Sequence, residues 1–197
     1  MTTSASVKDH YKLLDIDAWM QNGKVCAGAE GMLGQVAGPI LESFIGKLNS
    51  LKVIARKDGR NIYNLFNPPM PSSAGLRFLT RKLRMTLEKR AFPVTANLSI
   101  TQKCQCKCVH CSADPFNNPE RRELTTEEVK DVVDGALGLE ANLIIFVGGE
   151  PTIRKDLPEL IRHVDKSKAI VMIFTNGYTL ERDAETLAEA GLYSLNI

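Results

Sequence analysis

The chain has 197 residues and a mass of 21.8 kDa, with 44% apolar and 24% charged residues. These values exclude a disordered chain, a collagen-like repeat and a disulfide-rich miniprotein, and they predict one domain or one domain with a smaller appendage. The net charge of +2 conceals an asymmetry, since residues 1–90 contain 14 Lys and Arg against 7 Asp and Glu, whereas residues 91–197 contain 11 against 16. Two parts with different surroundings are therefore expected.

The basic balance of residues 1–90 suits contact with nucleic acid, an anionic membrane surface or an acidic partner. A solvated basic face needs no partner and is the interpretation we favour. The polar N-terminus lacks the apolar core of a secretory signal, and the apolar stretch of residues 25–40 is interrupted by Glu30 and too short to span a bilayer. We therefore expect a cytoplasmic protein.

Apolar residues at three- and four-residue spacing predict two helices in the front part of the chain. The first covers residues 40–51 and begins after Pro39, which suits a first helical turn and would break a longer helix. The second covers residues 76–90 and is basic and amphipathic. Such a helix can lie on a membrane or bind a partner, but we favour packing of its leucine stripe on its own domain.

Turn-forming residues separate these two helices. Asp58-Gly59 predicts a hairpin that joins strands at residues 51–56 and 61–65. Three prolines within residues 67–73 predict a linker, because proline continues neither helix nor sheet. A boundary is therefore expected near residue 75. It would divide a helical N-terminal region with a small hairpin, residues 1–75, from a second domain, residues 76–197.

From about residue 96 onward, predicted strands alternate with predicted helices. The strands cover residues 97–100, 143–147, 169–174 and 192–197, and the helices cover residues 125–139, 157–166 and 180–190. This alternation predicts an α/β fold with a parallel sheet and right-handed crossovers. Because chemistry gathers at the carboxyl ends of parallel strands, the residues directly after each strand are the candidate site.

Four of the five cysteines follow the first of these strands, at Cys104, Cys106, Cys108 and Cys111, whereas Cys26 stands apart. An odd number with so tight a cluster is not typical of a secreted disulfide framework and favours a metal or cluster site in a reducing compartment. Thiolates on one loop can converge on a soft metal ion or an iron–sulfur cluster. Three ligands from one loop would leave one iron of a four-iron cluster open for a substrate or cofactor.

Short polar segments follow the next two strands. Gly148-Gly149-Glu150-Pro151 combines two glycines, which let a ligand approach the backbone, with a carboxylate that suits an ammonium group. Thr175-Asn176-Gly177 follows the third strand. Each segment alone is a weak signal, and a glycine pair before an acid is usually only a turn.

Taken in order, the three segments resemble the radical S-adenosylmethionine (SAM) superfamily, and the resemblance covers about residues 94–197. The spacing of Cys104, Cys108 and Cys111, with His110 in the aromatic slot before the last cysteine, is its most specific part. The resemblance implies the N-terminal part of a partial (β/α)6 TIM-like barrel, preceded here by a mostly helical region. The run from Glu150 to Leu157 is similar to the peptide- and cofactor-maturing subgroup, which includes enzymes acting on haem or quinone precursors.

The resemblance also implies a role for each matching residue. Cys104, Cys108 and Cys111 would bind a [4Fe–4S] cluster, and Glu150 would help to hold the amino group of SAM. The full set expected at the cofactor is Gly148, Gly149, Glu150, Pro151, Thr175, Asn176 and His110. Reductive cleavage of SAM would yield a 5′-deoxyadenosyl radical that abstracts hydrogen from the substrate. The cofactor carries this chemistry, so no side chain is assigned a catalytic role.

The resemblance implies two kinds of partner, an electron donor such as flavodoxin or ferredoxin and a substrate that is a peptide or a small molecule. Further SAM contacts in this family come from the fourth to sixth strands, and only the start of the fourth is present. The chain therefore reads as a front half that we expect to be inactive alone.

Cys106 lies outside the family signature, as a bystander thiol or as a fourth sulfur in a zinc site. The alternative function is accordingly a non-catalytic fragment that binds iron–sulfur or zinc and carries a basic docking region.

Overall fold

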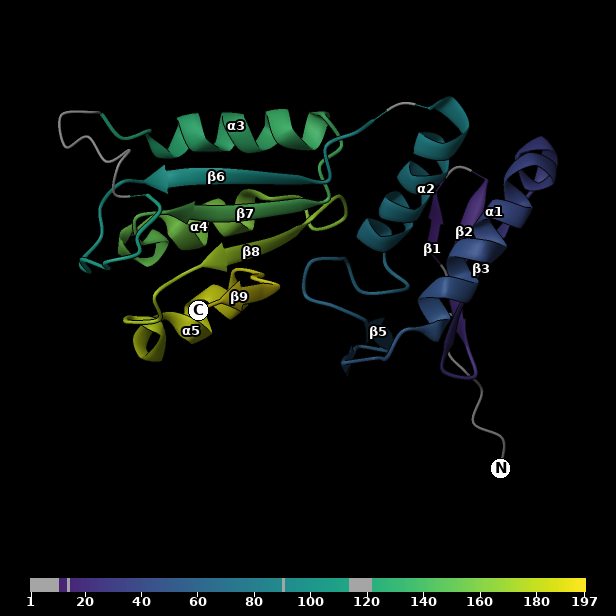
Figure 1. Cartoon of the computed structure of the whole chain (residues 1–197), viewed down its shortest axis with the longest axis horizontal. Helices are drawn as coiled ribbons and strands as arrows, with labels where there is room; N and C mark the ends of the chain where they lie inside the picture. The colour runs from purple at the N-terminus through teal and green to yellow at the C-terminus, as the bar shows by residue number, and fades with distance from the viewer. Residues whose placement is uncertain (1–10, 14, 90, 114–121) are drawn as a thin grey trace. The chain divides into compact units, whose positions relative to one another are not determined.

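The structure, a computed structural model, describes residues 11–13, 15–89, 91–113 and 122–197. The chain divides into two compact units, Met1–Phe92 and Pro93–Ile197. Figure 1 traces both along the chain. The second unit contains all the residues proposed above for cofactor binding.

The first unit combines two small antiparallel sheets with two helices. The three-stranded sheet has the order β1-β2-β3, and β4 and β5 form a separate hairpin. The described elements are β1 Tyr11–Leu13, β2 Ile16–Gln21, β3 Lys24–Ala29, α1 Gly31–Ser50, β4 Ala55–Lys57, β5 Arg60–Ile62 and α2 Ser73–Glu88. The hairpin expected around Asp58-Gly59 is confirmed by the pairing of β4 with β5.

The three-stranded sheet was not expected, so the prediction of a mostly helical front region is incomplete. Strands β2 and β3 pair over their full lengths around a two-residue turn at Asn22 and Gly23, whose φ angles are 51° and 75°. Asn-Gly is the pair that a tight hairpin turn with two positive φ angles favours. The signal was therefore present in the sequence and was missed.

Helix α1 begins earlier than expected, and Pro39 lies inside it rather than in its first turn. Proline costs one backbone hydrogen bond there and strains the preceding turn. The helix continues because Ala37 and Leu41, on either side of the proline, are buried in the core of this unit, and because α1 packs along β3. Tertiary packing thus outweighs the local preference.

The division between the units also differs from the boundary expected near residue 75. The proline-containing segment packs into the first unit, since Met70 pairs with Asn61 through two backbone hydrogen bonds of 2.7 and 2.9 Å. Helix α2 is capped by Ser72, whose hydroxyl accepts a hydrogen bond from Gly75 N at 2.9 Å. Its apolar stripe is buried in the same core as α1, so α2 belongs to the first unit. Leu76, Leu79 and Leu83 thus pack inside one unit, but that unit is the first and not the second domain to which the sequence assigned this helix.

The second unit is a parallel α/β sheet in the order β6-β7-β8-β9. Its described elements are β6 Thr95–Thr101, α3 Thr126–Gly138, β7 Leu143–Gly148, the 3-10 helix η3 Pro151–Ile153, α4 Leu157–His163, β8 Ile170–Phe174, α5 Leu180–Glu189 and β9 Ser194–Asn196. The alternation of strands and helices confirms the α/β fold class. Figure 1 shows that the arrowheads of β6, β7 and β8 point the same way, so their carboxyl ends share one edge.

Alternation along β7 and β8 separates two apolar faces of this sheet. Ile144 and Phe146 of β7 join Val171 and Ile173 of β8 in a core shared with α3, α4 and α5, whereas Leu143, Ile145, Ile170 and Met172 form a second cluster on the other face. Strands with two apolar faces read as continuous hydrophobic runs, as they do here. The sheet is thereby a rigid support for the loops at its carboxyl edge.

No helix in the described part of the chain is long and apolar enough to cross a membrane.

Candidate functional site

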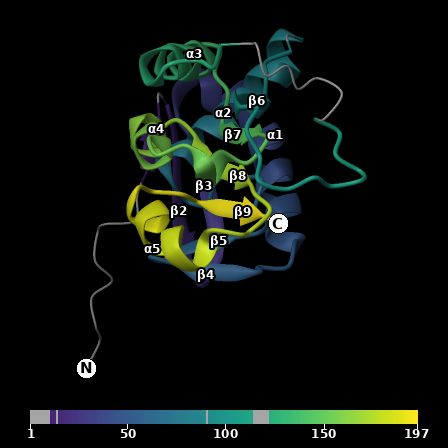
Figure 2. The ribbon, with the colours of Figure 1, turned by 90° about the vertical axis from the view of Figure 1, so that its left-hand side faces the viewer.

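Three segments meet at the carboxyl edge of β6, β7 and β8, which Figure 2 views from the side toward which these strands point. They are the cysteine loop, residues 102–111, the Gly-Gly-Glu-Pro segment, residues 148–151, and the Thr-Asn-Gly segment, residues 175–177. The parallel register explains their meeting, because β7 pairs with both β6 and β8. Hydrogen bonds link each segment to the next.

The two glycines join the end of β7 to the first residues of the cysteine loop. Gly149 N donates to Thr101 O and Glu150 N donates to Lys103 O, both at 2.8 Å. A Cβ on Gly148 would lie 2.1 Å from Thr101 O, and one on Gly149 would lie 2.2 Å from Lys103 O. Gly148 also has a φ of 141°, which L-residues with side chains rarely adopt. The glycines are therefore needed for close backbone packing, which holds the cysteine loop against the sheet.

Glu150 is a buried carboxylate with 1% of its surface exposed. Its Oε1 accepts hydrogen bonds from Thr152 N at 3.1 Å, from Thr152 Oγ1 at 2.7 Å and from Thr175 Oγ1 at 2.7 Å. Its Oε2 accepts one bond, from Asn176 N at 2.7 Å. Neutral donors from two segments thus stabilise the carboxylate, and Oε2 keeps acceptor capacity for a further donor.

Asn176 connects the Thr-Asn-Gly segment to the cysteine loop. Its Nδ2 lies 3.4 Å from Cys106 Sγ and 3.9 Å from Cys104 Sγ. Its Oδ1 accepts hydrogen bonds from Tyr178 N at 3.0 Å and from Gln105 Nε2 at 3.3 Å. One residue therefore touches the cysteine loop through its side chain and Glu150 through its backbone.

The four clustered cysteines differ in exposure. Cys104, Cys108 and Cys111 are exposed free thiols, whereas Cys106 is half-buried. Cys106 N donates to Cys104 Sγ at 3.4 Å, and burial together with the neighbouring Cys104 and Cys108 raises the pKa of the Cys106 thiol. The three predicted cluster ligands are thus all exposed to solvent, whereas the fourth thiol, that of Cys106, is half-buried.

The donor set fits an iron–sulfur cluster by its chemistry. Within the residues that the structure describes, no three His, Cys, Asp or Glu side chains are gathered closely enough to hold a metal ion. The three exposed cysteines nevertheless lie on one loop, without disulfide partners, and a turn in which Cys111 N donates to Cys108 O at 3.1 Å brings two of them into one bend. Thiols of this kind, free and open to solvent, can converge on a cluster.

His110 is exposed on the same loop, and Pro151 is buried at the start of η3. Pro151 occupies a first helical position, where its missing N–H costs nothing. Its burial next to the Glu150 cap gives it a packing role.

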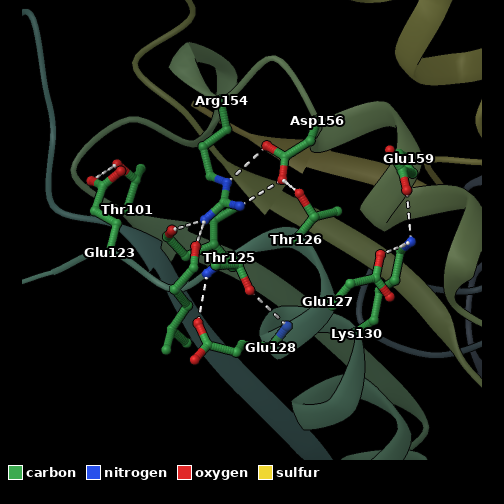
Figure 3. Close-up of polar contacts among 12 residues, drawn as sticks. Thr101, Glu123, Thr125, Thr126, Glu127, Glu128, Lys130, Arg154, Asp156 and Glu159 are labelled. Carbon is green, nitrogen blue, oxygen red and sulfur yellow. Dashed lines mark hydrogen bonds and ion pairs between the residues drawn. The ribbon is translucent and has the colours of Figure 1, made fainter.

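Arg154 makes a clamp at this edge that the sequence only partly indicated (Figure 3). Its Nε and Nη2 donate to the two oxygens of Asp156 at 2.9 and 2.5 Å, and its Nη1 donates to Ile100 O at 2.7 Å and Leu124 O at 2.9 Å. The contacts to two backbone carbonyls were not expected from the sequence. Because Ile100 precedes the cysteine loop and Leu124 precedes α3, Arg154 fixes both ends of the connection between β6 and α3.

Glu123 is a second residue that sequence reasoning missed. Its Oε1 accepts from Thr101 Oγ1 at 2.6 Å and from Gln102 N at 3.2 Å, and its Oε2 lies 3.5 Å from Lys103 Nζ. The hydrogen bond from Thr101 is the main cause that lowers the pKa of Glu123. Nothing in the local sequence marks Glu123, because its partners lie about twenty residues earlier in the chain.

The clamp predicts a specific pH dependence. The hydrogen bonds from Arg154, and a smaller contribution from Thr126, lower the pKa of Asp156 from 3.8 to about 2. Because the folded-state pKa is depressed, the stabilisation is complete above about pH 5 and is lost as the pH falls toward 2. We expect Asp156→Asn to lower the melting temperature by about 5 °C at pH 7, and this difference to shrink between pH 5 and pH 2.

The measurement is differential scanning calorimetry of both proteins across this pH range. Other carboxylates, including Glu128 with a pKa of about 2, titrate alike in both proteins and cancel in the difference. A difference that stays constant with pH would contradict the assignment.

Comparison with known proteins identifies one family. A family model for the Radical SAM superfamily matches residues 98–197. An Fe-coproporphyrin III synthase from Methanosarcina barkeri is 41% identical over 95 residues, covering 48% of this chain and 24% of its own length. A GTP 3′,8-cyclase from Tolumonas auensis is 39% identical over 103 residues, covering 51% of this chain and 31% of its own. Among solved structures, BtrN in complex with AdoMet and 2-DOIA is 22% identical with a TM-score of 0.46, covering 53% of this chain and 45% of that one.

The family match includes the sheet edge with its cysteine loop and buried acid, and the chain belongs to the Radical SAM superfamily. This membership confirms the expected class of enzyme and its cofactors, a [4Fe–4S] cluster and SAM. The chain spans between about a quarter and a third of the length of the two curated relatives named above.

Proposed function

We propose that this chain forms the cluster- and SAM-binding part of a radical SAM enzyme that matures a cofactor precursor. The observation that carries the proposal is the meeting of the cysteine loop, the buried Glu150 and Asn176 at one edge of a parallel sheet. Side chains from three separate loops are linked there by hydrogen bonds, which is how a fold positions a cofactor.

In this proposal Cys104, Cys108 and Cys111 hold the [4Fe–4S] cluster, and the Gly-Gly-Glu-Pro and Thr-Asn-Gly segments hold SAM, with His110 beside the last ligand. When bound, the cluster supplies the electron that cleaves SAM to a 5′-deoxyadenosyl radical. The chain's own contribution is placement, since Gly149 and Arg154 fix the base of the cysteine loop. Glu150 fixes Thr175 and Asn176, and its Oε2 is available to the amino group of SAM.

A cofactor precursor is proposed as substrate because the two curated relatives named above are an Fe-coproporphyrin III synthase and a GTP 3′,8-cyclase. A radical SAM enzyme also needs a reductant, and we propose a small acidic electron carrier of the flavodoxin or ferredoxin class. Such enzymes need reduced thiols, so a cytoplasmic location is part of the proposal. A peptide substrate is the alternative outcome of a substrate screen.

The basic charge of the first unit is better explained by local contacts than by docking. Arg60 lies over the ring of Tyr11 at 5.5 Å and Arg84 over that of Phe92 at 4.7 Å, measured to the ring centroids. Arg60 Nε also donates to Tyr11 Oη at 3.1 Å. These cations are held against aromatic rings of their own unit, which supports a solvated basic face rather than a nucleic-acid or membrane surface.

The proposal is tested by anaerobic reconstitution of the chain with iron and sulfide. We expect visible absorption and iron content of a four-iron cluster, reduced to background in Cys104→Ala, Cys108→Ala and Cys111→Ala. Cys106→Ala and Cys26→Ala are the matched controls and should load as the unsubstituted chain does.

Zinc in place of iron, or loading that depends on Cys106, would contradict the proposal. Either result would favour the non-catalytic alternative, in which four sulfurs form a closed site.

A further inference from the structure

We propose that Asn176 is a positioning residue for the cluster, which directs its amide N–H group at the sulfur of Cys104 and thereby raises the reduction potential of the cluster. The inference rests on the proposed function, because Cys104 must be a cluster ligand. It goes further by giving one residue outside the cysteine loop a defined effect on the electron-transfer step.

The orientation of the Asn176 amide follows from its partners. Tyr178 N is a backbone donor at 3.0 Å from Oδ1, and a donor can only face the oxygen of an amide. Gln105 Nε2 donates to the same oxygen at 3.3 Å. The nitrogen must therefore face the other way, toward the sulfurs of Cys104 and Cys106 at 3.9 and 3.4 Å. The polarity of the contact to sulfur is thus fixed by hydrogen bonding.

The position of Asn176 is fixed by the buried acid. Asn176 N donates to Glu150 Oε2 at 2.7 Å, and Glu150 in turn accepts from Thr175 and Thr152. The backbone of Asn176 therefore cannot shift without breaking a hydrogen bond to a buried carboxylate, which is costly. A side chain anchored in this way has a defined direction, as a residue that orients a ligand requires.

Cys104 receives a second donor on the same side. Cys106 N donates to Cys104 Sγ at 3.4 Å, so that two N–H groups face this sulfur from the protein. Cys106 Sγ lies closer to Asn176 than Cys104 Sγ does, which holds the extra thiol beside β8. Asn176 thus donates to the sulfur of Cys104, the proposed ligand, and also contacts the thiol of Cys106, which is not in the proposed ligand set.

The chemical consequence follows from charge. N–H donors to a thiolate withdraw electron density from it and stabilise the reduced, more negative cluster, so they raise its reduction potential. Removing the donor should lower the potential. Replacing it with a carboxylate should lower it further, because a negative charge then faces the sulfur.

The experiment uses the full chain, loaded anaerobically, with Asn176→Asp and Asn176→Ala. Asp keeps the shape of Asn and the acceptor for Tyr178 N, but it exchanges the donor nitrogen for oxygen and adds a negative charge. Gln105→Ala, which removes a partner of Oδ1 but leaves the N–H donors, is the control for the loop. Gln105→Glu is the control for added charge near Cys104. The readouts are iron content, the midpoint potential in a dye-mediated titration and the rate of iron loss to a chelator.

We expect a more negative midpoint in Asn176→Ala, a still more negative one in Asn176→Asp, and an unshifted one in Gln105→Ala. Iron loss should accelerate by roughly tenfold or more in both Asn176 variants, as is usual when a ligand loses its supporting hydrogen bond. A shift in Gln105→Glu as large as that in Asn176→Asp, together with an unshifted Asn176→Ala, would attribute the effect to charge alone and overturn the inference.

Equal midpoint potentials in the unsubstituted chain and in Asn176→Ala would overturn it as well. In that case the unsubstituted chain still loads its cluster and the proposed function stands. Failure of the unsubstituted chain to load would instead contradict the proposed function, and the inference with it.

Discussion

Glu150→Ala is expected to lower the free energy of unfolding of the second unit by about 4 kcal/mol. The substitution removes the acceptor for four donor groups of Thr152, Thr175 and Asn176, in a place that is 1% exposed. Each donor left unpaired in a buried site costs about 1–3 kcal/mol, and the small cavity admits some water, which returns part of this cost. The Thr-Asn-Gly segment should detach from the end of β7.

The measurement is urea unfolding, with hydrogen exchange of β7 and β8 as the local readout. Trp19 is the single tryptophan and lies in the first unit, so its fluorescence separates that unit from the second. Glu159→Ala is the matched control, because Glu159 is exposed and its pair with Lys130 at 2.6 Å is a surface ion pair worth at most about 1 kcal/mol. A loss no larger than that of the control would show that the buried carboxylate is not a structural acceptor.

Gly149→Ala is expected to destabilise the second unit by about 3 kcal/mol and to reduce cluster loading. The new Cβ would lie 2.2 Å from Lys103 O and 2.6 Å from its carbon, both of them backbone atoms. Backbone cannot rotate away as a flexible side chain does, so the base of the cysteine loop must move from the end of β7. The hydrogen bond from Glu150 N to Lys103 O at 2.8 Å should then be lost.

Gly135→Ala is the control for the same chemical change. Gly135 lies within α3, and a Cβ built on it meets nothing within 4 Å. Alanine in a helix interior is favoured over glycine by about 0.5–1 kcal/mol, so this variant should be slightly more stable. The two substitutions should thus act in opposite directions in the same unfolding experiment. A Gly149→Ala protein with unchanged stability and full cluster loading would show that the glycines are not needed for packing.

The second unit could be predicted well because its signals are local and periodic. The runs at β7 and β8 are continuously apolar, as buried parallel strands require, and Gly191, with a φ of 91°, follows the end of α5. Helix α3 begins at a capping box formed by Thr125 and Glu128, a signal that lies within four residues of sequence. The first unit was predicted less completely, because its short strands carry little periodicity and the Asn22-Gly23 turn was overlooked.

The sequence proposed the residues of the site, and the structure supplied the contacts among them. The order of cysteines, acid and Asn176 along the chain is visible in the sequence, whereas the burial of Glu150 among neutral donors is not. The glycines of the Gly-Gly-Glu-Pro segment were interpreted as space for a ligand, and the structure shows in addition that Thr101 O and Lys103 O fill the positions of their missing Cβ atoms. Glu123 was missed altogether, because its partners are brought to it only by folding.

The sequence by itself determined the family and led to the proposed set of three cysteines, because both depend on residue identity and spacing along the chain. The sequence also predicted two parts with different surroundings, because the balance of charges changes from basic to acidic along the chain. Only the tertiary structure decided that the first unit extends through α2, and that Arg154 and Asn176 join the ends of different strands. Those contacts link residues that are distant in the chain, and the parallel register of the sheet brings them together.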